Sequence, residues 1–332
     1  MSPVADNLTT ALLMATVVLA VGGSNRRFVV VGCINVVVAA NAGGAFSPFG
    51  DITTLMVWQA GLVEFQEFFP LVIPSIVNWL VTGAILSLAV PAGRPDAINE
   101  EASLRQGAWI VVGLFILTIS MAVSSHTLLH LPPVIGMMTG LGLLKLFGYY
   151  LQTRDGRFSL SAERVLNENA LGLEGEPRKT PATTDAQYDI YRNLQRVEWD
   201  TLLFFYGIML CVAGLGAFGY LAAGSDLMYG QLGPTTANIL VGFASAIFDN
   251  IPVMFAVLEM NPEMSLGQWQ LITLTAGVGG SMLAVGSAAG VAVMGQARGV
   301  YTFFGHLKWS WAIAIGYGAS VWSHFLVNGA VL

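Results

Sequence analysis

Three aspartates, Asp6, Asp51 and Asp249, stand in strongly apolar sequence. By our placement they are the only three of the 20 acidic residues that lie deep in a membrane. A carboxylate at that depth costs at least about 2.5 kcal/mol, so each one indicates a functional site. Asp6 and Asp249 are each followed by Asn and would also make good helix N-caps. Both interpretations can hold, because the polar turn that caps a buried half-helix can also bind an ion.

Oxygen-bearing side chains accompany these aspartates, and sodium is a hard cation that favours such ligands. Glycine pairs at 43–44 and 279–280 would let the backbone open around an ion. We predict sodium at Asp6, Asp51 and Asp249. The candidate residues for binding a cation or a proton are Asp6, Asn7, Thr9, Thr10, Asn41, Ser47, Asp51, Thr53, Thr54, Asp249, Asn250, Ser281 and Ser287.

The same groups could exchange sodium for protons. Burial favours the protonated form of a carboxylate, so an unliganded site would hold protons that sodium must displace. Competition at one site gives antiport if the site opens to one side of the membrane at a time. This chemistry needs no covalent step and no cofactor, so we predict a transporter and not an enzyme.

The elements that must position these residues are membrane helices. Hydrophobic residues make up 55% of the 332 and charged residues only 10%, against roughly a quarter in soluble domains. Apolar stretches near the length of about 20 residues that spans a bilayer recur along the chain. They cover 28–60, 68–90, 107–125, 131–151, 201–223, 230–248, 266–295 and 309–331. The predicted fold class is an all-α polytopic membrane protein.

The distribution of basic residues predicts the orientation. If Arg26 and Arg27 are cytoplasmic and the segment 230–262 dips in and returns to its own side, all 14 Lys and Arg lie inside or near an inner helix end. This is a strong positive-inside signal. It predicts a multi-pass protein of the cell inner (cytoplasmic) membrane, with the polar segment 152–198 as a cytoplasmic linker.

A paired motif predicts two inverted repeats. Asp6-Asn7 and Asp249-Asn250 are each followed, some thirty to forty residues later, by a helix that glycines interrupt. Broken helices in matching positions point to a transporter's binding site at the membrane midplane. We predict a first repeat at 1–151, the linker, and a second repeat at 199–332. A re-entrant hairpin needs two half-helices, yet only about five residues precede Asp6, so we expect the first repeat to be incomplete and N-terminal helices to be missing.

Other motifs favour less specific interpretations. His126 and His130 have the spacing of a zinc pair, but the Glu of a His-Glu-x-x-His motif is absent and no third ligand is evident, so we place them at the outer interface. Cys33 and Cys211 lie in apolar segments and are expected to pack as small hydrophobes. The net charge of −6 does not indicate a nucleic-acid partner.

Four further segments carry a resemblance to a known family, namely Asn41–Thr54, Leu129–Met138, Phe248–Met254 and Gly277–Gly290. They resemble the NhaD-type sodium/proton antiporters, a family of the ion transporter superfamily. The resemblance spans essentially the whole chain. It implies two inverted repeats, each with a re-entrant hairpin and a broken helix, and assembly as a homodimer in membrane lipid. It also implies transport of sodium, with lithium as a further candidate, in exchange for protons.

Two alternatives remain. A sodium-coupled dicarboxylate or oxyanion transporter would share the architecture, but relatives of that kind use Ser-Asn-Thr at the hairpin tips, and no basic residue is expected at midplane to meet an anion. An intramembrane aspartyl protease could use two buried aspartates that share a proton. Phe49-Gly50-Asp51 superficially resembles such a motif, but position 48 is proline where a Gly-x-Gly-Asp motif needs glycine.

Overall fold

The computed structural model describes residues 1–23, 25–90, 107–154 and 199–332, and every regular element in these ranges is a helix. The predicted linker 152–198 lies almost entirely outside the described residues. The helices before this gap are α1 (Ser2–Ala5), α2 (Asn7–Gly22), α3 (Arg26–Gly44), α4 (Ile52–Gln59), η1 (Phe65–Leu71), α5 (Val72–Ser87), α6 (Ala108–Leu129) and α7 (Pro133–Arg154).

The second group begins with α10 (Trp199–Ala217). It continues with α11 (Tyr220–Ser225), η2 (Asp226–Gln231), α12 (Pro234–Phe248), α13 (Asn250–Met260), α14 (Leu266–Gly279), η3 (Gly280–Met282), α15 (Ala288–Gln296), α16 (Phe303–Leu307) and α17 (Ser310–Asn328). The chain divides into two compact units, Met1–Glu100 with Leu202–Leu332 and, separately, Glu101–Thr201.

Several helices can cross a membrane by length and composition. The four single candidates are Arg26–Gly44, Phe65–Ser87, Ala108–Leu129 and Pro133–Leu151. Leu202–Ala217 and Tyr220–Gln231 form a fifth if this pair, bent by 82°, counts as one span. These helices confirm the predicted polytopic all-α class. Other apolar stretches form shorter helices, because 28–60 and 266–295 are broken where glycine and a capping residue interrupt them.

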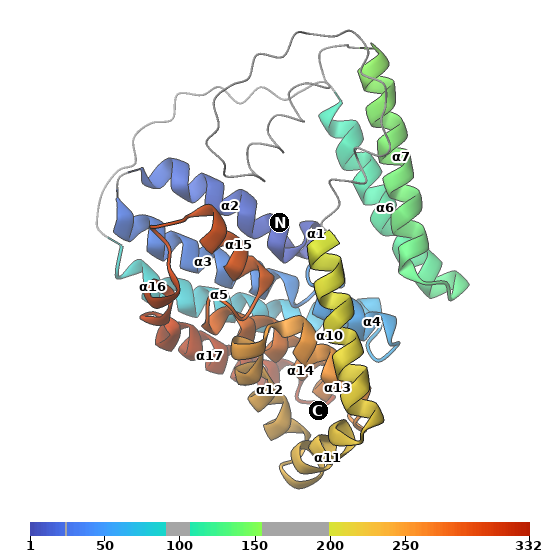
Figure 1. Cartoon of the computed structure of the whole chain (residues 1–332), viewed down its shortest axis with the longest axis vertical. Coiled ribbons are helices and arrows are strands. Elements are labelled where there is room, and N and C mark those ends of the chain that lie inside the picture. The colour runs from blue at the N-terminus through green and yellow to red at the C-terminus, as the bar shows by residue number, and fades with distance from the viewer. Residues whose placement is uncertain (24, 91–106, 155–198) are drawn as a thin grey trace. The chain divides into compact units, whose positions relative to one another are not determined.

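In the first unit, α2, α3, α5 and α17 lie side by side in that order (Figure 1). The α14 helix packs against α12, α17 and α3 and is buried along its whole length. Its polar side chains, Gln268, Gln270, Thr273 and Thr275, are buried together with the apolar ones, so neighbouring elements surround the helix. The breaks in α3–α4 and α14–α15 therefore lie inside this unit.

The second unit contains the antiparallel pair α6 and α7. A Cβ on Gly136 would lie 2.5 Å from the backbone of Ala122, and one on Gly140 would lie 2.1 Å from the Thr118 hydroxyl. Small residues one turn apart are a common way for membrane helices to approach closely. The remaining faces are strongly apolar and largely exposed.

The two Asp-Asn turns have nearly the same backbone. Asp6 has φ 64° and ψ 150°, and Asp249 has φ 67° and ψ 145°. Each follows one helix and begins the next, and α12 and α13 pack against each other on either side of Asp249. This is the local arrangement that a re-entrant hairpin requires.

The two broken helices also match. Asp51 (φ −150°, ψ 143°) caps α4, and Ser287 (φ −153°, ψ 149°) caps α15. A Cβ on Gly44 would lie 2.6 Å from the Gly50 oxygen, and one on Gly280 would lie 2.5 Å from the Gly286 oxygen. Only glycine permits so close a crossing of the chain with itself. The paired motif in the sequence thus corresponds to a paired structure.

Candidate cation site

The Asp51 carboxylate is the centre of the candidate site. It caps α4, and its Oδ1 accepts a hydrogen bond from the backbone N–H of Thr53 at 3.2 Å. Its Oδ2 accepts from the side-chain amides of Asn7 at 3.0 Å and Asn250 at 2.9 Å. Only 3% of Asp51 is exposed. The asparagines of the two Asp-Asn turns, far apart in sequence, therefore meet on one oxygen.

The Asn41 side chain joins the two halves of the site. Its amide nitrogen donates to the Ser281 hydroxyl at 3.0 Å and to the Ser287 hydroxyl at 2.9 Å. Its oxygen accepts from Asn7 at 3.2 Å. These four side chains are buried. A continuous hydrogen-bond network thus runs from Asp51 through the amides to the hydroxyls of the second break.

Two further hydrogen bonds repeat between the halves. The Ser2 hydroxyl donates to the Ala40 oxygen at 2.5 Å, and the Ser245 hydroxyl donates to the Ala276 oxygen at 2.7 Å. Each serine lies four residues before its Asp-Asn turn. Each bond ties a hairpin to the helix just before its break. Our sequence analysis missed both serines, although their equal spacing from Asp6 and Asp249 could have revealed them.

The remaining predicted residues occupy several environments. Asp6 and Asp249 are partly buried at the turns, and their charges act on Asp51. Thr10 is buried one turn after Asn7, and its hydroxyl has no hydrogen-bond partner among the described residues. The Ser47 hydroxyl accepts from the Phe49 N–H and the Thr54 hydroxyl contacts the Gly44 oxygen, so both support the break itself. Thr9 is exposed on α2.

His306 supports the second break from α16, outside the candidate spans. Its Nε2 lies 2.9 Å from the Ser281 backbone oxygen, and its Nδ1 lies 2.6 Å from the Tyr301 hydroxyl. Burial lowers the pKa of His306 to about 4, so the ring is neutral. Because a carbonyl only accepts, Nε2 carries the proton and Nδ1 accepts from Tyr301. This neutral ring fixes the backbone next to the Ser281 side chain.

The site contains carboxylate, amide and hydroxyl groups, and none of the described Lys and Arg side chains lies in it. The lysine and arginine side chains that the structure describes are all exposed, namely Arg26, Arg27, Lys145, Arg298 and Lys308. Among the described residues, no group of three or more His, Cys, Asp and Glu could hold a metal ion. Oxygen ligands arranged around one central carboxylate suit a hard monovalent cation better than an anion.

The bridging role of Asn41 predicts a measurable stability effect. Asn41→Ala removes the partner of the Ser281 hydroxyl and one of the partners of the Ser287 hydroxyl and of the Asn7 amide. A buried polar group left unpaired costs about 1–3 kcal/mol. We expect a clearly lower melting temperature in detergent. Asn35→Ala, on the same helix, is the matched control, because the buried Asn35 oxygen has no hydrogen-bond partner among the described residues. Equal melting temperatures for the two variants would contradict the bridging role.

The fold and this site together define the class of membrane transporters built from paired broken helices. In agreement, the sequence model of the citrate transporter family (CitMHS) matches residues 1–279. The chain belongs to the NhaD family of Na⁺/H⁺ antiporters within this class, as its relatives show.

The Na⁺/H⁺ antiporter NhaD of Alkalimonas amylolytica is 57% identical over 98% of this chain and 67% of its own length. NhaD of Vibrio parahaemolyticus is 56% identical over 95% of this chain and 75% of its own length. Sodium/proton antiporter 1 of Arabidopsis thaliana is 31% identical over 99% of this chain and 54% of its own length. The chain thus spans about two thirds of the length of its bacterial relatives.

Proposed function

We propose that this multi-pass membrane protein exchanges sodium ions for protons, with Asp51 as the group for which the two compete. The observation that carries the proposal is the meeting of Asn7 and Asn250 on one buried oxygen of Asp51. Protein interiors retain a carboxylate in this setting only with strong local compensation. A bound sodium ion or a proton supplies that compensation by neutralising the charge.

The surrounding amides can serve both states of the site. In the described arrangement they donate N–H groups to the carboxylate. An amide that rotates presents its oxygen instead, which is the atom that a hard cation needs. The unpartnered Thr10 hydroxyl offers another oxygen on the face of α2 that carries Asn7. Sodium and a proton both need the Asp51 carboxylate, so the binding of one excludes the other, which is the requirement for exchange.

The proposal extends to Asp6 and Asp249 as secondary groups. Each lies at a turn next to an amide that contacts Asp51, so its charge would attract a cation toward the centre. The Asp249 Oδ1 also accepts from the Asn250 N–H at 2.8 Å, which orients the Asn250 backbone. We assign the direct contact with sodium to Asp51 and a guiding role to the other two.

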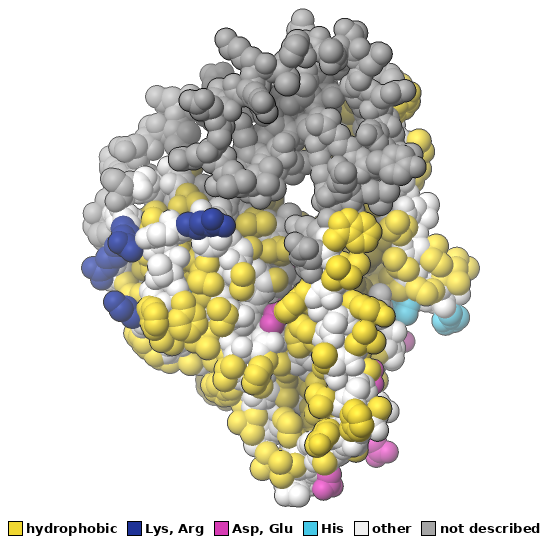
Figure 2. Space-filling model, in the orientation of Figure 1, with side chains coloured by type: hydrophobic (Ala, Val, Ile, Leu, Met, Phe, Trp, Pro, Cys, Tyr) yellow, Lys and Arg dark blue, Asp and Glu magenta, His cyan; other side chains and the backbone are white. Residues whose placement is uncertain are grey.

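We also propose the membrane in which the transporter lies and its orientation there. The Lys and Arg side chains visible in Figure 2 gather near α2, α3 and α16, and the part of this face near α11 shows acidic side chains but no basic one. With the positive-inside rule this separation favours the inner membrane with Arg26 and Arg27 cytoplasmic. The exposed apolar faces of α6 and α7 are suited to lipid or to a second copy in a homodimer.

A dye assay tests the proposed exchange. The full-length protein is reconstituted into liposomes that contain a pH-sensitive dye, and sodium, lithium, potassium or citrate is added outside. We expect sodium, and to a lesser degree lithium, to move protons in the opposite direction. Proton movement that depends on citrate, with no response to sodium alone at any pH tested, would instead establish the dicarboxylate or oxyanion alternative.

A further inference from the structure

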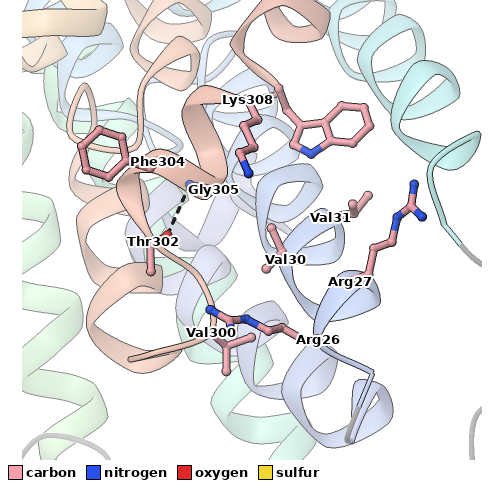
Figure 3. A pocket seen from close by; sticks show the side chains of 10 residues that line it. Arg26, Arg27, Val30, Val31, Val300, Thr302, Phe304, Gly305 and Lys308 are labelled. Carbon is pink, nitrogen blue, oxygen red and sulfur yellow. Dashed lines mark hydrogen bonds between the residues drawn. The ribbon is translucent and has the colours of Figure 1, made fainter.

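A pocket with a volume of about 500 Å³ lies away from Asp51, between the first turns of α3 and the segment 300–309. This is the size of many small-molecule sites. Figure 3 shows Val30 and Val31 on the α3 side and Thr302, Phe304 and Gly305 on the other. The proposed exchange makes no use of this pocket.

Three cations line the pocket, namely Arg26, Arg27 and Lys308. None of them is paired with a carboxylate among the described residues, and no acidic residue lines the pocket. The Arg26 Nη2 donates to the Gly299 oxygen at 3.1 Å, which holds the guanidinium in place while its other N–H groups stay available. Three uncompensated charges in one concave space favour an anionic ligand.

One neutral donor and the start of a helix add to the recognition chemistry. The Thr302 hydroxyl accepts from the Gly305 N–H at 3.2 Å, the dashed contact in Figure 3, so its own proton remains free to donate. Arg26 and Arg27 are the first two residues of α3, whose positive helix end adds to the field of their side chains. Arginine forks, an ammonium, a hydroxyl and a helix start together match the oxygens of a phosphate group.

The apolar part of the pocket indicates where that phosphate comes from. Val30, Val31, Val300 and Phe304 share the lining with the cations. Phe304 is 73% exposed. Trp309 also lines the pocket and stacks on Trp311, which is 55% exposed. The candidate span α3 begins at Arg26, so the pocket lies where a membrane surface would be. Charge beside exposed aromatic and apolar groups at that depth is typical of contact with lipid.

We propose that this pocket binds the phosphate headgroup of an anionic membrane lipid. The headgroup lies against Arg26, Arg27 and Lys308, and the acyl chains extend along the exposed apolar side chains of the α16 region. The lipid thereby links α3, which carries Asn41, to the segment that carries His306.

The test uses native mass spectrometry of the full-length protein in detergent, offered equal amounts of phosphatidylglycerol, cardiolipin and phosphatidylcholine. We expect the wild type to retain an anionic lipid in preference to phosphatidylcholine. Each charge removed should weaken that retention about five-fold. The double variant Arg26→Gln, Lys308→Gln should therefore lose it about 25-fold, whereas Lys308→Arg should keep it.

Arg298→Gln is the matched control, because Arg298 is exposed nearby, donates to the Gly295 oxygen and does not line the pocket. Equal losses in the control and the double variant would overturn the proposal in favour of general surface attraction. If millimolar inorganic phosphate displaced the lipid and abolished the preference for anionic lipid over phosphatidylcholine, the pocket would be a site for free phosphate and the lipid proposal would be wrong. Melting temperatures identify any variant that fails to fold, and Arg27→Gln then replaces it.

Discussion

Sodium-dependent proton movement is expected to disappear in Asp51→Asn. Asparagine keeps the shape of the side chain and can still accept from the Thr53 N–H as the cap of α4. It removes the charge that attracts the cation in a buried, low-dielectric site, which is worth several kcal/mol and thus a loss of affinity of more than about 100-fold. The liposome assay across a range of sodium concentrations measures this loss.

Asp226→Asn provides the control for charge alone, because Asp226 is an exposed acid in η2. Its exchange should equal that of the wild type. Normal exchange by folded Asp51→Asn would remove Asp51 from the centre of the site and would move the assignment to Asp6 or Asp249. A loss in both variants would point to a general effect of net charge.

The second large effect concerns the break before α15. In Gly286→Ala the new Cβ would lie 2.6 Å from the Ala246 oxygen and 2.7 Å from the Gly280 oxygen, both backbone atoms that cannot turn aside. Overpacking of this kind costs about 1–3 kcal/mol, and here it displaces the segment that carries Ser281 and Ser287. We expect a lower melting temperature together with impaired exchange.

Gly318→Ala is the matched control in α17. A Cβ at Gly318 meets no atom within 4 Å, and alanine favours a helix over glycine by roughly 0.5–1 kcal/mol. This variant should melt at the wild-type temperature or above it and should transport normally. If Gly286→Ala matched it in both measurements, the close crossing at the second break would have no structural importance.

Much of the architecture could be predicted from sequence because the membrane leaves few alternatives. An apolar stretch that crosses the membrane must become a helix. A glycine pair beside Asp or Ser inside such a stretch favours a break. The breaks at Asp51 and Ser287 followed from these rules. The packing of α14 among its neighbours could not be predicted, since a helix that is buried on all sides has no exposed face that would indicate which neighbour each side contacts.

The limits of the site prediction have the same cause. Thr9 and Thr10 are adjacent, and α2 is too uniformly apolar to show which of the two faces inward, so both were predicted although only Thr10 is buried. Asn41 was predicted as a ligand, but its hydrogen bonds to Ser281 and Ser287 depend on a contact across 240 residues of sequence or more. Such pairings arise from tertiary packing, which one sequence does not reveal.

The backbone at Asp6 and Asp249 has a cost in conformational energy. A non-glycine residue close to this region of φ and ψ is strained by about 1–3 kcal/mol. Two such turns together consume a noticeable part of the 5–15 kcal/mol by which folded proteins are typically stable. Glycine would relieve the strain but would also remove a carboxylate beside the proposed ion site. Thermal stability would favour glycine at these two positions, whereas attraction of a cation favours aspartate. Selection for higher stability at the turns would therefore weaken the attraction of the cation.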